Sequence, residues 1–131
     1  MGNDLTNKDA AAISVIGTNS IGEIVKPLIR EIHLFDTYVA GTSHLTDKSV
    51  LKTVRIGDEL TLQREANNQY DNFAILVLNK EMKKLGYVPE RDNLVFARLM
   101  DAGKLLKAKV TEITPKEHYT LIILRIYLVD L

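Results

Sequence analysis

The pattern of hydrophobic positions between residues 31 and 88 predicts four short β-strands. Each segment is rich in β-branched or aromatic residues, and turn residues such as Gly57 and Asp58 separate the segments. The predicted strands are residues 31–41, 59–65, 73–79 and 83–88. Short consecutive strands of this kind are typical of an antiparallel meander.

The hydrophobic period changes at residues 90–103 and predicts one helix. Pro89 stands before its first turn, and Gly103 stands where a left-handed residue commonly ends a helix. One stripe of the helix holds four apolar side chains, Val95, Phe96, Leu99 and Met100. We therefore expect this helix to pack on the strands through that stripe.

Two long strands complete the pattern, at residues 105–113 and 119–131, with a turn around Pro115. Because the helical segments do not alternate with strands, a parallel α/β sheet is disfavoured. The fold class expected is mostly β: a small, closed or nearly closed six-stranded β-barrel with one inserted α-helix. The last strand is apolar on both faces, so its outer side needs a cover, either the N-terminal arm or a second subunit.

The N-terminal segment differs in composition from the rest of the chain. Residues 1–22 are rich in Asn, Ala, Ser, Thr and Gly, which favours a loosely packed arm. Apolar residues then follow helical spacing at Ile24, Val25, Leu28, Ile29 and Ile32. We expect an arm over residues 1–30 that includes a short helix, and a barrel domain over residues 31–131.

Composition and charge exclude several classes of function. The 131 residues contain 17 Lys and Arg and 17 Asp and Glu, so the chain lacks the overall positive charge of many nucleic-acid binders. With no cysteine, disulfides, thiolate nucleophiles and Cys-based zinc sites are excluded. Arg125 and Asp130 interrupt the most apolar run, and the N-terminus lacks the features of a signal peptide. A cytoplasmic location is expected.

A polar, amide-rich stretch, NNQYDN at residues 67–72, lies directly before the apolar strand at 73–79. The amides of this stretch are good turn formers, and Asp71 could cap the turn by accepting backbone N–H bonds. An ordinary structural turn is therefore one interpretation of the stretch. The order of motifs around it favours a second interpretation.

An ordered series of motifs resembles the HIRAN domain family over about residues 31–131. The series is the strand end at Ala40-Gly41, the turn at Gly57-Asp58, Arg64-Glu65, the motif Asn68-x-Tyr70-Asp71, the strand start at Ala74-Ile75, Gly86, and the helix leading to Gly103. The resemblance implies an OB-like barrel that binds single-stranded DNA and recognises a free 3′ end. It also implies a role in DNA repair or replication-fork processing, beside a helicase or nuclease partner.

The resemblance implies DNA-binding roles for three residues of the polar stretch, Asn68, Tyr70 and Asp71. A 3′-hydroxyl is both a donor and an acceptor, whereas an internal phosphodiester would bring negative charge against a carboxylate. Asp71 would therefore sense the free end. The ring of Tyr70 would stack on a base, which contributes about 1 to 3 kcal/mol per base.

Several positions depart from the family pattern. Ser43 and His44 stand where the family has a basic residue and an aromatic, and Tyr87 replaces the histidine of the eukaryotic relatives. Tyr119 stands near the family's aromatic before the last strand. Phosphate contacts would need basic side chains, and residues 80–109 contain eight basic and four acidic residues. The candidates are Arg91, Lys83, Lys84, Lys107 and Lys109.

Other chemistries find little support. His33, His44 and His118 are too dispersed for a metal motif, and Glu90 with Asp92 stands at a helix start, where capping is the simpler role. We expect no catalytic residue, no metal and no cofactor. The alternative function is a protein-interaction or dimerisation module that uses the apolar final strand and binds no nucleic acid.

Overall fold

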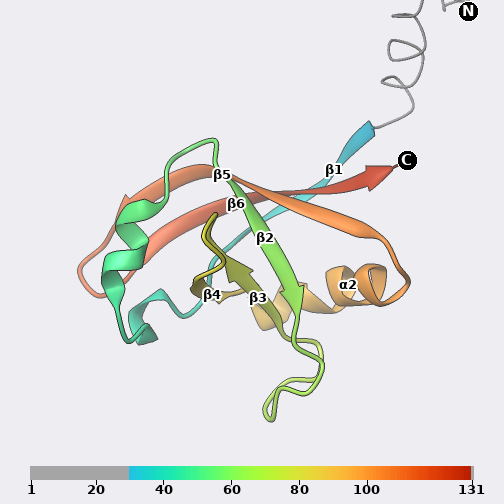
Figure 1. Cartoon of the computed structure of the whole chain (residues 1–131), viewed down its shortest axis with the longest axis horizontal. Coiled ribbons are helices and arrows are strands. Elements are labelled where there is room, and N and C mark those ends of the chain that lie inside the picture. The colour runs from blue at the N-terminus through green and yellow to red at the C-terminus, as the bar shows by residue number, and fades with distance from the viewer. Residues whose placement is uncertain (1–29, 131) are drawn as a thin grey trace, which may run out of the picture. The chain divides into compact units, whose positions relative to one another are not determined.

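The computed structural model describes residues 30–130, which form a mostly β fold with six strands in one antiparallel sheet (Figure 1). The elements are β1 (Arg30–Tyr38), η3 (Thr42–His44), η4 (Lys48–Thr53), β2 (Glu59–Arg64), β3 (Ile75–Leu78), β4 (Lys84–Tyr87), α2 (Glu90–Asp101), β5 (Leu105–Pro115) and β6 (Thr120–Asp130). All six predicted strands and the inserted helix are confirmed, with boundaries shifted by a few residues. The predicted N-terminal helix lies outside the described residues, except that Ile32 belongs to β1.

The strands follow the order β1-β6-β5-β2-β3-β4, so β1 and β4 form the two edges of the sheet. These edges meet at one antiparallel bridge beyond the end of β1, between Ala40 and Tyr87. Ala40 N–H donates to Tyr87 O at 2.7 Å, and Tyr87 N–H donates to Ala40 O at 2.9 Å. The sheet is therefore not closed by a continuous set of strand pairs, but it is curved so that its two edges meet at this bridge. This arrangement agrees with the nearly closed barrel that was expected.

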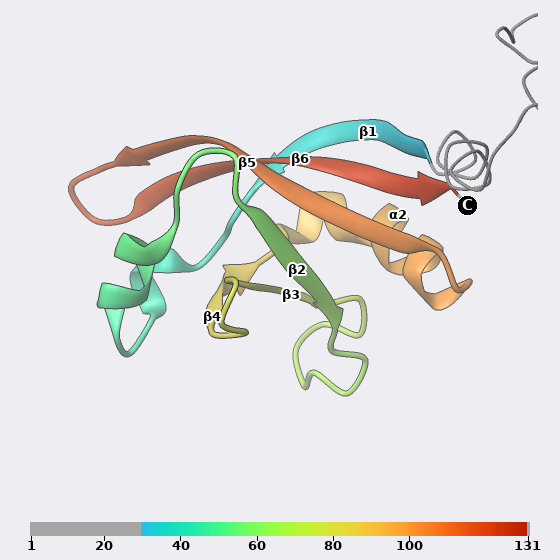
Figure 2. The same ribbon diagram turned by 45° about the horizontal axis from the view of Figure 1, so that its top comes forward.

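The core lies on the inward face of this curved sheet. Its most deeply buried large side chains are Phe96, Ile75, Leu85, Ile122, Leu124 and Ile126. Figures 1 and 2 show α2 beside the layer formed by β5 and β6, and Phe96 of α2 also stacks on Phe35 of β1 with ring centroids 4.5 Å apart. Helix and sheet thus share a single core.

The packing face of α2 includes three of the four residues of the predicted stripe: Phe96 is buried, and Leu99 and Met100 are partly buried against the core, whereas Val95 is not. Asn93, Phe96 and Ala97 are buried, a spacing of three and four residues that defines one helix face. Val95 is 54% exposed because it lies about 100° around the helix from Phe96. The predicted ends of the helix are confirmed, with Pro89 before Glu90 and Gly103 in the left-handed region at φ 89°.

The final strand, β6, is an inner strand of the sheet. It lies between β1 and β5, and its inward residues Ile122, Leu124 and Ile126 are fully buried. Both backbone edges of β6 are therefore already paired, so β6 has no free edge to which a partner strand could be added. Its outward residues are half-buried beside the neighbouring strands.

One exposed turn stores backbone strain that a substitution can relieve. Met82, between β3 and β4, has φ 65° and is 55% exposed. A left-handed L-residue costs about 1 to 2 kcal/mol, and glycine removes this cost but loses some backbone entropy on folding. Met82→Gly is therefore expected to raise the free energy of unfolding by about 0.5 kcal/mol, or the Tm by about 2 to 4 °C.

Thermal melting of the wild type and Met82→Gly would check this expectation. Glu81→Gly is the matched control, because Glu81 occupies the same turn and does not have a positive φ. The control is expected to lower the Tm. Equal melting shifts for the two variants would contradict the strain account.

Candidate functional site

The loop between β2 and β3, residues 65–74, is called here the corner loop. Asn68 Oδ1 accepts from the N–H groups of Tyr70 at 2.8 Å and Asp71 at 3.0 Å. Asp71 Oδ1 accepts from Phe73 N–H at 2.8 Å. These are side-chain to backbone turns of the kind that Asn and Asp favour. The predicted turn, including the backbone bond to Asp71, is confirmed.

Two sets of contacts between residues far apart in the sequence attach the corner loop to α2. Arg64 donates from Nε to Asp101 at 2.8 Å and from its terminal nitrogens to the carbonyl oxygens of Asn72 and Ala74. Asp71 Oδ2 accepts from Asn93 Nδ2 at 2.7 Å, and Asn93 is buried. A buried amide needs such a partner. Both arms of the corner loop are therefore fixed in position.

Glu65, at the start of the corner loop, links it to β4. Its Oε1 accepts from Asn68 Nδ2 at 2.7 Å and from the Tyr87 hydroxyl at 2.8 Å. The bonds from Asn68 and then Tyr87 hold the pKa of Glu65 below its ordinary value. Burial, and then the bond to Glu65, raises the pKa of Tyr87. The pair is therefore an ionised carboxylate and a neutral phenol at neutral pH.

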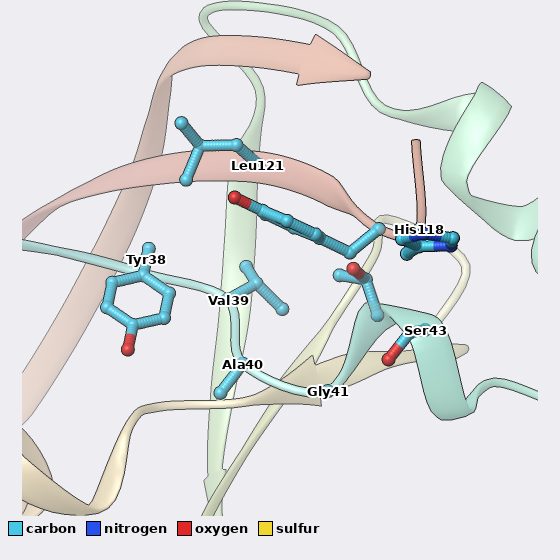
Figure 3. Close-up of a pocket in the computed structure, with 9 residues that line it drawn as sticks. Tyr38, Val39, Ala40, Gly41, Ser43, His118 and Leu121 are labelled. Carbon is cyan, nitrogen blue, oxygen red and sulfur yellow. The ribbon is translucent and has the colours of Figure 1, made fainter. Parts of the chain in front are cut away.

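A surface pocket of about 520 Å³ adjoins the Ala40–Tyr87 bridge, because Ala40 is one of its lining residues (Figure 3). Its wall is formed by the segment Tyr38, Val39, Ala40, Gly41, Thr42 and Ser43, together with His118, Tyr119 and Leu121. Thr42 fixes the wall, because its hydroxyl donates to Thr120 O at 3.2 Å and accepts from Thr120 N–H at 3.1 Å. Tyr119 is half exposed. The pocket thus offers aromatic rings to a ligand.

Two of the basic candidates border these features. The Arg91 guanidinium lies 5.1 Å from the ring centroid of Tyr38, which lines the pocket. The Lys84 ammonium lies 4.7 Å from the ring centroid of Tyr87. These contacts are in the range of cation–π interactions and leave both charges at the surface.

The other basic candidates point elsewhere. Lys107 lies 3.0 Å from Glu31 and 3.4 Å from Glu59, and Lys109 lies 3.7 Å from Glu31. Both lysines alternate with the buried residues of β5 and so lie on the outward face of the sheet. Lys83 lies 3.8 Å from Glu81 in the exposed turn.

The structure thus divides the predicted site residues into two adjoining groups. Asn68, Asp71 and Tyr87 meet around the corner loop, where Tyr70 is 90% exposed, while Ser43 and Tyr119 line the pocket. His44 follows Ser43 in η3 and is exposed, but it does not line the pocket.

Four further residues were not predicted from sequence as ligand-binding positions. They are Tyr38 and His118 in the pocket, and Glu65 and Asn93 around the corner loop. Glu65 belonged to the ordered motif series, which was the available signal for it. Over residues 30–130, no cluster of three or more His, Asp or Glu side chains is arranged to hold a metal ion, and no helix there is long and apolar enough to cross a membrane.

The curved six-stranded sheet, its inserted helix and the pocket at its closing bridge define a small domain of OB-like fold. The chain belongs to the HIRAN domain family, whose model matches residues 32–128. No curated protein matches the chain.

Three solved structures are similar to this domain. A protein from Lactobacillus plantarum is 31% identical, with a TM-score of 0.72 over 79% of this chain and 99% of the other. The crystal structure of the HIRAN domain of human HLTF is 21% identical, with a TM-score of 0.65 over 80% and 82%. The NMR structure of the HLTF HIRAN domain is 20% identical, with a TM-score of 0.53 over 76% and 80%.

Proposed function

We propose that the domain over residues 31–131 is a non-enzymatic module that binds single-stranded DNA and prefers a free 3′ end. The observation that supports this most is that the Ala40–Tyr87 bridge connects two features. Ala40 lines an aromatic pocket, and the Tyr87 hydroxyl donates to Glu65 in a corner loop rich in carboxylates and amides. Membership of the HIRAN family gives the class of ligand.

The aromatic side chains would bind bases by stacking. Tyr119 is half exposed in the pocket and Tyr70 is almost fully exposed on the corner loop. Every base has a π-face, so stacking on these rings would tolerate any sequence. Ser43 and His44 would contact the strand beside the pocket.

The corner loop favours an uncharged end of the DNA strand. Glu65 and Asp71 both carry negative charge there, and Arg64 is already bonded to Asp101. A 3′-hydroxyl can donate to a carboxylate, whereas a 3′-phosphate would place like charges together. A carboxylate has about four acceptor positions, and the protein uses one on each oxygen of Asp71. Asp71 can therefore accept a further hydrogen bond from the free end.

Phosphate contacts would come mainly from Arg91 and Lys84, which border the pocket and the corner. Two phosphate contacts on a single strand give a slope of log K against log salt of about −1.4. We therefore expect a shallow salt dependence. A partner helicase or nuclease is proposed from the family resemblance, and a cytoplasmic location from the composition of the sequence.

Fluorescence anisotropy with a short oligonucleotide, in parallel with the same oligonucleotide blocked by a 3′-phosphate, tests the function. At low salt the free 3′-hydroxyl is expected to bind more tightly. Absence of binding to both at high micromolar protein would reject a DNA ligand, and equal binding would reject end recognition.

The same assay across a salt series tests the phosphate contacts. Arg91→Ala is expected to lower the salt slope by about 0.7, the contribution of one phosphate on a single strand. The matched control is Lys109→Ala, which removes one positive charge from the outward face of β5. If Lys109→Ala lowered the salt slope as much as Arg91→Ala, the DNA would have to contact the outward face of the sheet.

A further inference from the structure

The surface at the far end of the β2–β3 pair from the corner loop carries both cations and exposed apolar side chains. It consists of the exposed residues of two segments, 47–58 and 79–83, and is called here the turn surface. We propose that the turn surface binds a peptide segment of a partner protein that carries both acidic and apolar side chains. The turn surface is thus a second binding site, separate from the corner loop.

Pairing of β2 with β3 brings the two segments of the turn surface together. The antiparallel register joins Thr61 to Leu78, so residues that precede β2 lie beside residues that follow β3. Across this junction, Lys80 Nζ lies 3.0 Å from Asp58 Oδ1. The corner loop joins the other ends of the same two strands, and the six residues of β2 span about 20 Å (Figure 1). A ligand at the corner loop therefore leaves the turn surface free.

The buried side chain of Asn79 holds the turn surface in shape. Its Oδ1 accepts from the N–H groups of Glu81 and Lys83, both at 2.9 Å. Its Nδ2 donates to Thr53 Oγ1 at 3.1 Å, and Thr53 is the last residue of η4, so this bond attaches η4 to the turn between β3 and β4. A ligand therefore meets a surface that is already ordered, which lowers the entropic cost of binding.

The turn surface carries more positive than negative charge. Its cations are Lys48, Lys52, Arg55, Lys80 and Lys83, and its carboxylates are Asp47, Asp58 and Glu81. Lys80 and Lys83 have carboxylate partners within the surface. Over residues 30–130, Lys48 and Lys52 form no ion pair, and both side chains are exposed. These two charges are therefore available to an anionic ligand.

Two large apolar side chains lie among these charges. Ile56 is 67% exposed and Met82 is 55% exposed, and they belong to the two turns that the Lys80–Asp58 pair joins. One exposed apolar side chain is common, but two within a cationic surface offer contacts that only a ligand with apolar groups can use. The ligand that fits the turn surface therefore combines acidic and apolar side chains.

The same surface is a poor match for nucleic acid. Segments 47–58 and 79–83 contain no aromatic residue, so unpaired bases have no ring on which to stack. A duplex presents a continuous line of phosphates, which would meet the carboxylates of Asp47, Asp58 and Glu81 as well as the lysines. A peptide carries separate acids that can face the cations and avoid the carboxylates. The observations therefore favour a peptide over DNA.

Fluorescence anisotropy with labelled synthetic peptides and the whole chain tests the proposal. The leucine peptides are short, carry aspartates on both sides of two leucines, and differ in the separation of the leucines. The serine peptides have serine in place of both leucines, and a DNA duplex with both 3′ ends phosphorylated is the nucleic-acid probe. At low salt, at least one leucine peptide is expected to bind, and to bind more tightly than its serine counterpart.

Lys52→Glu tests the contribution of charge. This variant reverses one unpaired charge and is expected to weaken binding of the leucine peptide by about 2- to 30-fold, the equivalent of two surface ion pairs. The matched control is Lys104→Glu, which makes the same change of charge at an exposed lysine after α2. The control is expected to bind the peptide as the wild type does.

Ile56→Ser tests the apolar contribution. It is expected to weaken binding of the leucine peptide by about 5- to 30-fold, because it removes most of an apolar contact. The matched control is Val95→Ser, at a position on α2 that is 54% exposed. This control is also expected to bind the peptide as the wild type does.

Each contrary outcome overturns the proposal. No binding of any leucine peptide does so, as does equal binding of the leucine and serine peptides. Unchanged affinity in both Lys52→Glu and Ile56→Ser, or an equal loss in a variant and its control, places the peptide elsewhere. Binding of the blocked duplex that is lost in Lys52→Glu, without binding of peptide, assigns the turn surface to nucleic acid. None of these outcomes depends on whether the 3′-hydroxyl oligonucleotide binds.

Discussion

Gly86→Ala is expected to destabilise the domain by about 3 kcal/mol and to separate the two edges of the sheet. A β-carbon on Gly86 would lie 2.2 Å from the carbonyl oxygen of Ala40 and 2.7 Å from Cγ1 of Val39. One of these contacts is with backbone, so the strands themselves must move apart. Such movement breaks the paired hydrogen bonds of the Ala40–Tyr87 bridge, and with them the link between pocket and corner.

Urea denaturation followed by far-UV circular dichroism would measure this loss. Gly57→Ala is the matched control, because Gly57 has φ 92° and no atom near its would-be β-carbon. The control bears only the cost of the left-handed backbone, about 1 to 2 kcal/mol. If Gly86→Ala cost no more than Gly57→Ala, the close approach at the bridge would not limit the fold.

Tyr70→Ala is expected to weaken binding of single-stranded DNA by about 5- to 150-fold, equivalent to the 1 to 3 kcal/mol that one stacked base contributes. The side chain is 90% exposed, so its removal takes almost no packing from the folded protein. The stability of the variant is therefore expected to match that of the wild type within about 0.5 kcal/mol.

Anisotropy titrations and melting curves on the same samples would check both halves of this prediction. Tyr70→Phe keeps the ring and is expected to retain most of the DNA affinity. Ile56→Ala removes an exposed apolar side chain outside the corner loop and is expected to retain all of the DNA affinity. Wild-type affinity in Tyr70→Ala would exclude stacking at this position.

Strands and helix could be predicted because each has a clear hydrophobic period. In β5 the alternation of Leu106, Ala108 and Val110 with polar residues appears directly as buried and exposed positions. The segment between β1 and β2 has no such period, and the short helices η3 and η4 there were missed. Helices this short are held by local bonds, such as Asp47 accepting from Ser49 N–H, rather than by an apolar stripe.

Partnerships between distant residues were the least accessible to sequence. Asn93 lies in the helix as a polar residue and was not expected in the core, yet it is buried because Asp71, far along the chain, accepts its amide. In the same way, Lys107 belonged to a locally basic segment. Its acidic partners, Glu31 and Glu59, come from other strands, so only the folded sheet reveals that its charge is paired.

The bonds that Arg64 makes to the corner loop also bear on the speed of recognition. Arg64 donates to the carbonyl oxygens of Asn72 and Ala74. Within the loop, the side chains of Asn68 and Asp71 accept from the N–H groups of Tyr70 and Phe73. A loop already in its final shape loses little conformational entropy when a ligand arrives. Binding is then expected to proceed in one kinetic phase whose rate rises linearly with DNA concentration, without a slow rearrangement of the protein.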